Sequence, residues 1–258
     1  MKFETLVTPI GKDWVVLIPL YGVADSKLLA GEVEVLDLKA ESERLGNLFE
    51  QHGYQATTTA NEADIIVLNS CVVRQSAEDR VTNKLDNLQV LKKQRPGLTL
   101  ALTGCLVDSN TAQLNKDFPY VDHFFKPGDP PAWLGQSTSE QPVLQDAPPA
   151  VYLTIIQGCD NFCSYCIVPY RRGRERSRPV AELRKEVECL ASRGAREITL
   201  VGQNVDSYGH DLPGKPDLSD LLAELNGIEG LARLRFLTNH PKDMTTRLIG
   251  AIAEVLAR

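Results

Sequence analysis

Three cysteines lie close together in one short segment, Cys159, Cys163 and Cys166, directly after an apolar run over residues 151–156. Their spacing of i, i+4 and i+7 supplies three thiolates to one iron–sulfur cluster, for which four protein ligands are usual. A cluster held by three thiolates leaves one iron atom without a protein ligand. An open metal position is where substrate binds in catalytic metal sites. The segment therefore predicts a cluster that takes part in catalysis.

Two other interpretations of these cysteines are open. A zinc site usually shows two separated ligand pairs, whereas the next Cys and His residues after this segment are Cys189 and His210. A disulfide framework is unfavourable because only 6 Cys are spread over 258 residues and three of them share this segment. We favour the cluster, with zinc or loop cysteines that hold no ligand as the alternatives.

An arginine-rich run follows the cysteines and consists of Arg171, Arg172, Arg174, Arg176 and Arg178. Guanidinium groups match phosphate geometry, and the neighbouring Tyr170 adds a ring on which a base can stack. The net charge of −6 and the pI of about 5.3 give no global basic field, so RNA contact depends on this local run. The alternatives are a solvated charge run tied down by acidic neighbours, or pairing with a cofactor carboxylate.

Apolar strands and amphipathic helices alternate along the chain and must position these residues. Strands are predicted over residues 14–20, 33–38, 63–69, 98–103, 121–125, 152–156, 198–201 and 234–237. Helices are predicted from residue 40, over 77–91, 180–190 and 218–225, and over 248–255 after a cap at Asp243. Such alternation favours parallel α/β sheets. Cys189 is expected to be a buried thiol beside Leu190.

Gln203 and Asn204 follow the predicted strand over residues 198–201. Ligands bind at the carboxyl ends of parallel strands, so both residues are candidates for lining a cofactor or substrate site. A polar turn that closes through Gly202 is the alternative. His240 follows the last predicted strand, and a packed histidine is as compatible with the sequence as a functional one.

Composition divides the chain into four regions. Residues 1–38 show no pattern tied to a function, residues 39–126 form a first α/β domain, and residues 150–258 form a second. Residues 127–149 contain six prolines and are predicted to be a linker. No apolar stretch reaches the length of a membrane span, and Glu4 and Asp13 disfavour a signal peptide. Free thiols fit a reducing cytoplasm.

The segment over residues 158–170, Gly-Cys-Asp-Asn-Phe-Cys-Ser-Tyr-Cys-Ile-Val-Pro-Tyr, and the run Arg-Arg-Gly-Arg-Glu-Arg-Ser-Arg-Pro over residues 171–179 resemble the radical SAM methylthiotransferases. Residues 201–209, Val-Gly-Gln-Asn-Val-Asp-Ser-Tyr-Gly, and residues 239–242, Asn-His-Pro-Lys, resemble the branch that acts on tRNA. The resemblance covers roughly residues 39–258. It implies an α/β fold: a parallel α/β methylthiotransferase domain followed by a truncated radical SAM partial (β/α) barrel.

The resemblance also implies cofactors and partners. Cys159, Cys163 and Cys166 would hold a [4Fe-4S] cluster whose open iron binds S-adenosylmethionine, and Tyr165 would pack on the adenine ring. The implied reaction inserts sulfur at C2 of N6-isopentenyladenosine in tRNA and methylates it. The implied partners are the tRNA anticodon stem-loop, bound by the arginine run, and an electron donor protein, with no membrane involved.

The sequence departs from the family in the N-terminal domain. The family holds a second [4Fe-4S] cluster there with three cysteines, of which Cys71 and Cys105 match the second and third. Val35 stands where the first is expected and cannot ligate iron. We therefore do not expect an intact second cluster.

The sequence also ends before the remaining barrel strands and the RNA-binding C-terminal domain of the family. We expect a fragment, a truncated product or a subunit that another chain completes. The alternative functions are an inactive remnant that binds RNA or a partner, and a related enzyme acting on threonylcarbamoyladenosine or a ribosomal protein.

Overall fold

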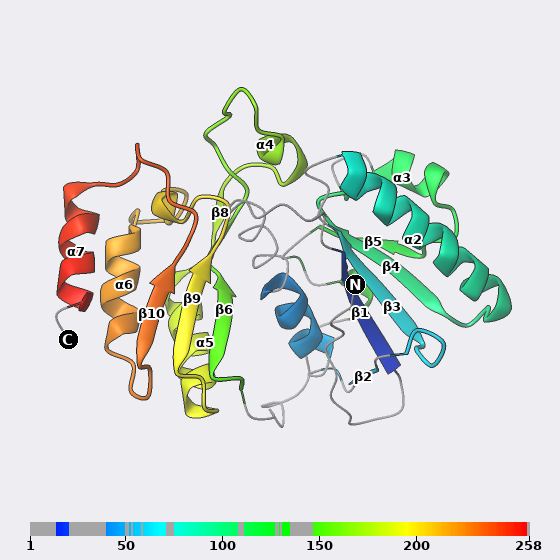
Figure 1. Ribbon diagram of the computed structural model, residues 1–258, viewed down its shortest axis with the longest axis horizontal. Helices are drawn as coiled ribbons and strands as arrows, with labels where there is room; N and C mark the ends of the chain where they lie inside the picture. The colour runs from blue at the N-terminus through cyan, green and yellow to red at the C-terminus, as the bar shows by residue number, and fades with distance from the viewer. Residues whose placement is uncertain are drawn as a thin grey trace. The chain divides into compact units, whose positions relative to one another are not determined.

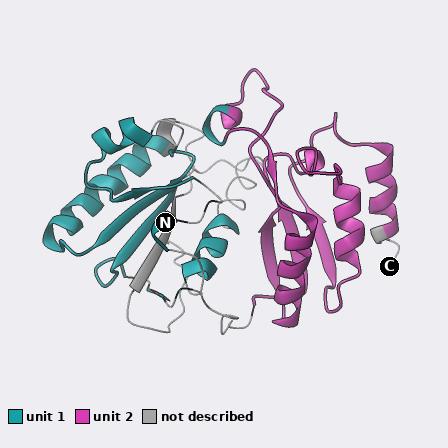
Figure 2. Cartoon of the chain, turned by 180° about the vertical axis from the view of Figure 1, so that it is seen from behind, with its two compact units in different colours: residues 1–142, 170–172 teal, residues 143–169, 173–258 magenta. Residues whose placement is uncertain are grey.

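The computed structural model describes residues 14–20, 40–49, 52, 54–57, 59–70, 75–107, 111–126, 129, 131–134 and 147–256. The chain divides into two compact units, shown in different colours in Figure 2. The first comprises Met1–Pro142 with Tyr170–Arg172, and the second comprises Val143–Pro169 with Gly173–Arg258. The segment from residue 170 to 172 therefore belongs with the first unit, although the cysteine-rich segment directly before it belongs with the second.

The first unit contains a parallel five-stranded sheet in the order β2-β1-β3-β4-β5 (Figure 1). Its elements are β1 (Trp14–Leu20), β2 (Gln55–Ala56), β3 (Ile65–Ser70), β4 (Thr99–Gly104), β5 (His123–Phe124), α2 (Gln75–Gln94), α3 (Thr111–Asp117) and a helix over residues 40–49. The run over residues 14–20, which the sequence assigned to the N-terminal region, thus forms a strand beside β3. The strand predicted over residues 33–38 lies outside the described residues.

Both faces of this sheet are covered. Successive strand residues point to opposite sides, and alternate residues of β3 belong to two different core clusters. Ile66 and Leu68 of β3 share one core cluster with Leu85 of α2. Ile65 and Val67 share another with Phe49 of the helix over residues 40–49. The continuous apolar run of β3 is therefore explained by burial on two sides, as the sequence predicted.

The predicted linker is not wholly without structure. Residues Ala132–Leu134 form a 3-10 turn, η1. Trp133 stacks on His123 with ring centroids 4.9 Å apart, and Leu134 is buried in the cluster that contains Phe49. Trp133 and Leu134 of this proline-rich stretch therefore pack on the first unit, a role that composition alone did not reveal.

The second unit is built on a parallel three-stranded sheet in the order β10-β9-β6. Its elements are β6 (Ala150–Thr154), β7 (Ile156–Gln157), β8 (Arg176–Ser177), α5 (Val180–Ser192), β9 (Glu197–Val201), η2 (Val205–Ser207), α6 (Leu218–Asn226), β10 (Arg233–Phe236) and α7 (Thr246–Leu256). A short helix, α4 (Val168–Arg171), has its first two residues in this unit and its last two in the first unit. Each strand of the sheet is followed in sequence by one of the helices α5, α6 and α7, the repeat that begins a (β/α) barrel.

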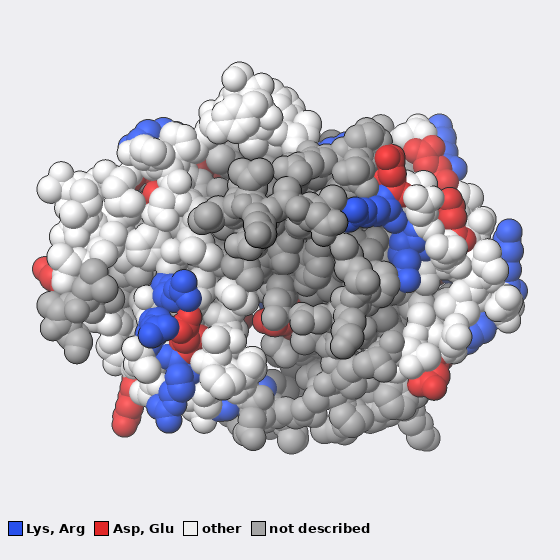
Figure 3. All heavy atoms as spheres, viewed as in Figure 1, with Lys and Arg blue, Asp and Glu red and all other residues white. Residues whose placement is uncertain are grey.

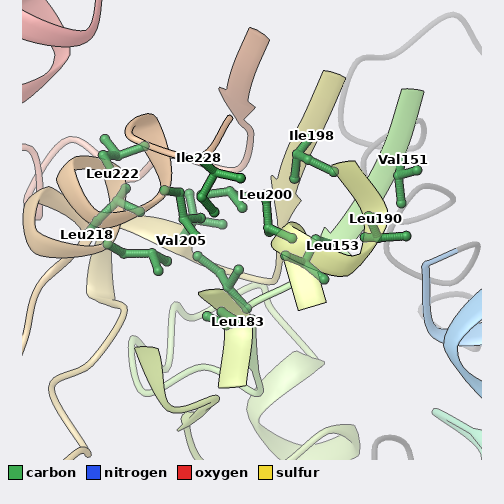
Figure 4. Close-up of a cluster of buried hydrophobic side chains, with 14 of the residues drawn as sticks. Val151, Leu153, Leu183, Leu190, Ile198, Leu200, Val205, Leu218, Leu222 and Ile228 are labelled. Carbon is green, nitrogen blue, oxygen red and sulfur yellow. The ribbon is translucent and has the colours of Figure 1, made fainter. Parts of the chain in front are cut away.

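One apolar core joins these elements (Figure 4). Leu153 of β6 and Leu200 of β9 point toward Leu183 of α5 and Leu222 of α6. Packing of this kind keeps the carboxyl ends of the strands in register, and polar loops leave the sheet there.

Two local expectations were wrong. The last helix is capped by Thr245, whose hydroxyl accepts the Leu248 amide at 3.1 Å, whereas Asp243 accepts from Asn204 instead. Cys189 is exposed, because it lies one position away from the buried stripe of α5 that includes Leu190. No helix in the described part of the chain is long and apolar enough to cross a membrane.

Candidate functional site

The segment over residues 158–169, here called the cysteine loop, directly follows β7, and residues 170–175 lead from it to β8. The two strands pair in antiparallel register, Ile156 with Ser177 and Gln157 with Arg176. The Arg178 amide donates to the Ile155 carbonyl at 2.9 Å, which continues the pairing. The loop is therefore closed at its base by backbone hydrogen bonds next to the carboxyl end of β6.

Gly158 makes the turn into the loop. Its φ of +75° lies in the left-handed region, and a Cβ there would meet the Arg174 carbonyl oxygen at 2.1 Å. Its amide donates to Gln203 Oε1 at 2.7 Å, and the next amide, of Cys159, donates to the Gly173 carbonyl at 3.2 Å. Gln203, a predicted cofactor-binding residue, thus holds the start of the cysteine loop, and this contact was not foreseen from the sequence.

Asp160 and Glu175 bind each other reciprocally across the loop. The Asp160 amide donates to Glu175 Oε1 at 3.2 Å, and the Glu175 amide donates to Asp160 Oδ1 at 3.1 Å. The buried Ser207 hydroxyl donates to the same Glu175 oxygen at 2.8 Å. Arg174 pairs with Asp160 Oδ1 at 2.8 Å and lies over the Phe162 ring. Sequence reasoning missed Glu175, Asp160 and Ser207, whose partners are 15 and 32 residues away.

The three thiols differ in environment. Cys159 is buried, with 8% of its surface exposed, while Cys163 and Cys166 are half-buried. Burial raises the pKa of the Cys159 thiol, the charges of Glu175 and the other two cysteines raise it further, and a hydrogen bond from the Asn161 amide lowers it. The thiols therefore act on one another electrostatically, and a cationic iron centre would relieve that repulsion.

No three His, Cys, Asp or Glu side chains of the described residues are placed to hold a single metal ion. Zinc requires such convergence on one point. Thiolates that hold a four-iron cluster bind separate iron atoms and do not require it. The donor set of the cysteine loop, three soft sulfur ligands on one clamped segment, fits an iron–sulfur cluster.

Apolar side chains of the cysteine loop face solvent. Tyr165 is 88% exposed, and Phe162 and Ile167 are exposed as well. The charge of Cys163 and a hydrogen bond to it raise the pKa of Tyr165. The Tyr165 ring is not packed against the described part of the protein, so ordinary loop packing does not account for it.

A buried polar network lies where β9 and β10 end. Asn204 donates its amide Nδ2 to Asp243 Oδ2 at 2.7 Å, and its Oδ1 is buried without a hydrogen-bond partner among the described residues. Asp206 accepts from Asn239 Nδ2 at 2.7 Å and from the His240 amide at 2.9 Å. Burial raises the pKa of Asp206. Asn204 thus keeps one buried acceptor free, and His240 contributes to the network through its backbone.

The arginine run is divided among different environments. Arg178 donates to Glu182, Glu186 and the Thr154 carbonyl, and its side chain is 12% exposed. Arg172 is buried within the first unit. Arg174 keeps 74% of its side chain exposed. The run as a whole does not present five free guanidinium groups.

Arg171 and Arg176 complete the run. Arg171 pairs with Glu78 at 3.2 Å, and Arg176 is exposed on β8. On the face seen in Figure 3, basic and acidic side chains of the described residues are interspersed rather than gathered into one wide basic patch.

Cys105 follows β4 in the first unit and is buried. Its Sγ accepts from Arg172 Nε at 3.1 Å, while Arg172 Nη1 pairs with Glu41 Oε1 at 2.7 Å. Ser70 and Gly104 are register partners, so β3 and β4 end at the same edge of the sheet. Cys71, which follows β3, and Val35 lie outside the described residues.

Both halves of the chain match known protein families. Residues 38–126 match the family model UPF0004, an uncharacterised protein family, and residues 153–257 match the radical SAM superfamily. A radical S-adenosylmethionine methyltransferase from Kitasatospora setae, solved with cobalamin and a [4Fe-4S] cluster bound, has a similar fold. The TM-score is 0.50 at 14% identity, over 95% of this chain and 57% of that one. The chain therefore combines a UPF0004 region with a radical SAM fold.

Curated relatives narrow the class further. A tRNA-2-methylthio-N(6)-dimethylallyladenosine synthase from Dehalococcoides mccartyi is 53% identical over 218 residues, which are 84% of this chain and 52% of that protein. Proteins of the same name from Herpetosiphon aurantiacus and Dictyoglomus thermophilum are 44% and 42% identical over 84% and 83% of this chain and 52% and 53% of their own. The chain belongs to the radical SAM methylthiotransferase family. It spans about half the length of the curated relatives that it matches.

Proposed function

We propose that this chain is part of a tRNA methylthiotransferase that modifies C2 of N6-isopentenyladenosine beside the anticodon. The observation that carries the proposal is the cysteine loop, whose base is held by backbone hydrogen bonds and whose three thiols interact electrostatically. The same chain also has a UPF0004 region. A bound [4Fe-4S] cluster with S-adenosylmethionine would supply the one-electron chemistry that protein side chains lack.

The residues of the second unit take distinct roles in this proposal. Cys159, Cys163 and Cys166 hold the cluster. Tyr165 offers an exposed ring to the adenine of S-adenosylmethionine, and Asn204 Oδ1 is a buried acceptor for an amine or hydroxyl of that cofactor. Both roles suit a site at the carboxyl ends of the strands, where parallel sheets bind ligands.

The tRNA contact is assigned to the exposed members of the arginine run. Arg174, which keeps 74% of its side chain exposed beside Asp160, and the exposed Arg176 can reach phosphates, whereas the side chains of Arg172 and Arg178 are mostly buried in their ion pairs. Arg171, paired with Glu78, is available only if that pair opens. An electron donor protein completes the proposed partners. A reducing cytoplasm suits the free thiols.

The test is anaerobic reconstitution with iron and sulfide, then incubation with S-adenosylmethionine, a reductant and tRNA that carries isopentenyladenosine. Mass spectrometry of the digested nucleosides would detect the methylthio product. Cys163→Ala should abolish cluster loading, whereas Cys189→Ala, at an exposed thiol outside the loop, should leave it unchanged. A protein with a full cluster that forms no product under these conditions would contradict the proposal.

A second candidate function is a chain that binds the radical cluster but donates no sulfur. In the first unit, Arg172 Nε donates a hydrogen bond to Cys105 Sγ. The given sequence contains no cysteine before Cys71. Iron analysis separates the candidates: about four iron atoms per chain indicate one cluster, and about eight indicate two. A threonylcarbamoyladenosine or ribosomal protein substrate would give a different modified product in the same mass spectra.

A further inference from the structure

We infer that Glu175 is a positioning residue that fixes Cys159 and sets the redox potential of the cluster through its negative charge. The inference rests on the proposed function insofar as it requires a cluster in the cysteine loop. It concerns a residue outside the cysteines, on the segment that returns from the loop to β8.

The positioning role follows from the hydrogen bonds. One oxygen of Glu175, Oε1, accepts from the Asp160 amide at 3.2 Å and from the Ser207 hydroxyl at 2.8 Å. Asp160 is adjacent to Cys159 in the chain, and Ser207 lies in η2 after β9. Glu175 therefore connects the backbone beside the buried cysteine to the sheet of the second unit.

A second hydrogen bond runs in the opposite direction between Asp160 and Glu175. The Glu175 amide donates to Asp160 Oδ1 at 3.1 Å, so the two residues hold each other through one bond in each direction. Arg174 binds the same Asp160 oxygen at 2.8 Å and partly neutralises Asp160. That ion pair leaves Glu175, rather than Asp160, as the carboxylate whose charge acts on the loop.

The charge role follows from the half-buried location of Glu175 and from its place beside the first cysteine. Its Oε1 lies 3.2 Å from the amide nitrogen of Asp160, the residue that follows Cys159 in the chain. Adding an electron to a cluster at this position makes the site more negative, so a neighbouring carboxylate disfavours the reduced form. Glu175 should make the cluster a stronger one-electron donor once an external reductant has supplied the electron.

The test compares three variants of the full chain after anaerobic reconstitution. Glu175→Gln keeps an acceptor oxygen for Asp160 and Ser207 but removes the charge, and Glu175→Ala removes both. Glu188→Gln removes an equal charge from α5, where Glu188 pairs with Arg184. Iron and sulfide per chain report positioning. The midpoint potential, from electron paramagnetic resonance with titanium(III) citrate as one-electron donor, reports charge.

We expect Glu175→Gln to load the wild-type amount of iron and to titrate at a more positive potential. The expected change is on the order of tenfold in the ratio of reduced to oxidised cluster, which is about 59 mV for one electron. Glu175→Ala should lose iron, and Glu188→Gln should match the wild type in both measurements.

The inference is overturned if Glu175→Gln titrates like the wild type, or if it shifts to a more negative potential. Loss of iron in Glu175→Gln as well would also overturn the charge role, because glutamine retains the acceptor. Full iron in Glu175→Ala would overturn the positioning role. If the wild-type chain itself binds no iron, the proposed function fails first and the inference fails with it, so the two failures are distinguishable.

Discussion

Replacing Gly158 with alanine tests whether the cysteine loop is held by the contacts at its first turn. Gly158 and Gly173 both have a positive φ, +75° and +83°, so alanine costs about 1 kcal/mol in backbone strain at either position. A Cβ at Gly158 would lie 2.1 Å from the Arg174 carbonyl oxygen and 2.6 Å from the Gly173 carbonyl oxygen. A Cβ at Gly173 has no atom within 4 Å. Gly173→Ala is therefore the matched control.

The clash at Gly158 involves backbone atoms, so the loop itself must move. That movement would break the bond from the Gly158 amide to Gln203 and the bond from the Cys159 amide to Gly173. Each bond contributes about 1 kcal/mol to the free energy of unfolding. We expect Gly158→Ala to lower that free energy by about 3 kcal/mol and Gly173→Ala by about 1 kcal/mol.

Urea unfolding of the iron-free chain, followed by circular dichroism, measures this difference. The Gly158 variant should also melt roughly 4–8 °C below the Gly173 variant, as a difference of about 2 kcal/mol implies for a chain of this size. After anaerobic reconstitution it should carry less iron per chain than the control. Equal stability losses in the two variants, or full iron in Gly158→Ala, would show that the first turn does not hold the loop.

Three further predictions concern ionisable side chains that form ion pairs or hydrogen bonds. Arg172→Met should lower the free energy of unfolding by roughly 3–5 kcal/mol, because it leaves the Glu41 carboxylate buried without its ion pair to Arg172. Adding Glu41→Gln should restore most of this loss. Strictly additive losses in urea unfolding would contradict the prediction. Burial raises the pKa of Asp206, so its contribution to stability is largest below its unfolded pKa of about 3.9 and is lost as pH rises through the folded value. In urea unfolding, the stability of the wild type minus that of Asp206→Asn should therefore fall as pH rises above about 4. Asp220→Asn should show the opposite trend, because the hydrogen bond from Arg247 lowers the pKa of Asp220 and its contribution is lost as pH falls.

The fold was largely predictable because the strands of both sheets are short apolar runs between polar segments. β3, β4 and β9 lie within one or two residues of their predicted bounds. β1 shows a limit of prediction from the local sequence. The run Trp14–Leu20 was recognisable as a strand, but its place beside β3 depends on pairing that the local sequence does not encode. Cys189 shows the same limit on a helix, where one step of about 100° separates a buried from an exposed position.

For the candidate site, the sequence predicts the possible cluster ligands but not the residues that hold them in place. The spacing of the cysteines identifies the loop by itself. The residues that hold it come from far along the chain: Gln203 is 45 residues from Gly158, and Ser207 is 32 residues from Glu175. The pairing within the arginine run was not predictable for the same reason, since Glu41, the carboxylate that pairs with Arg172, is 131 residues away. Local charge density indicates a basic surface only where no distant acid neutralises it.

These supports are unevenly distributed, and their distribution assigns different roles to the three thiols. The strand pair β7–β8, Gln203 and Glu175 all act on the first residues of the cysteine loop, next to the buried Cys159. Cys163 and Cys166 are half-buried on the outer part of the loop, where one backbone bond joins them, from the Cys166 amide to the Cys163 carbonyl at 2.9 Å. Cys159 is thus positioned by the folded chain around it, whereas fewer of these contacts act on Cys163 and Cys166. Preorganising one ligand in this way would lower the entropy cost of binding a cluster.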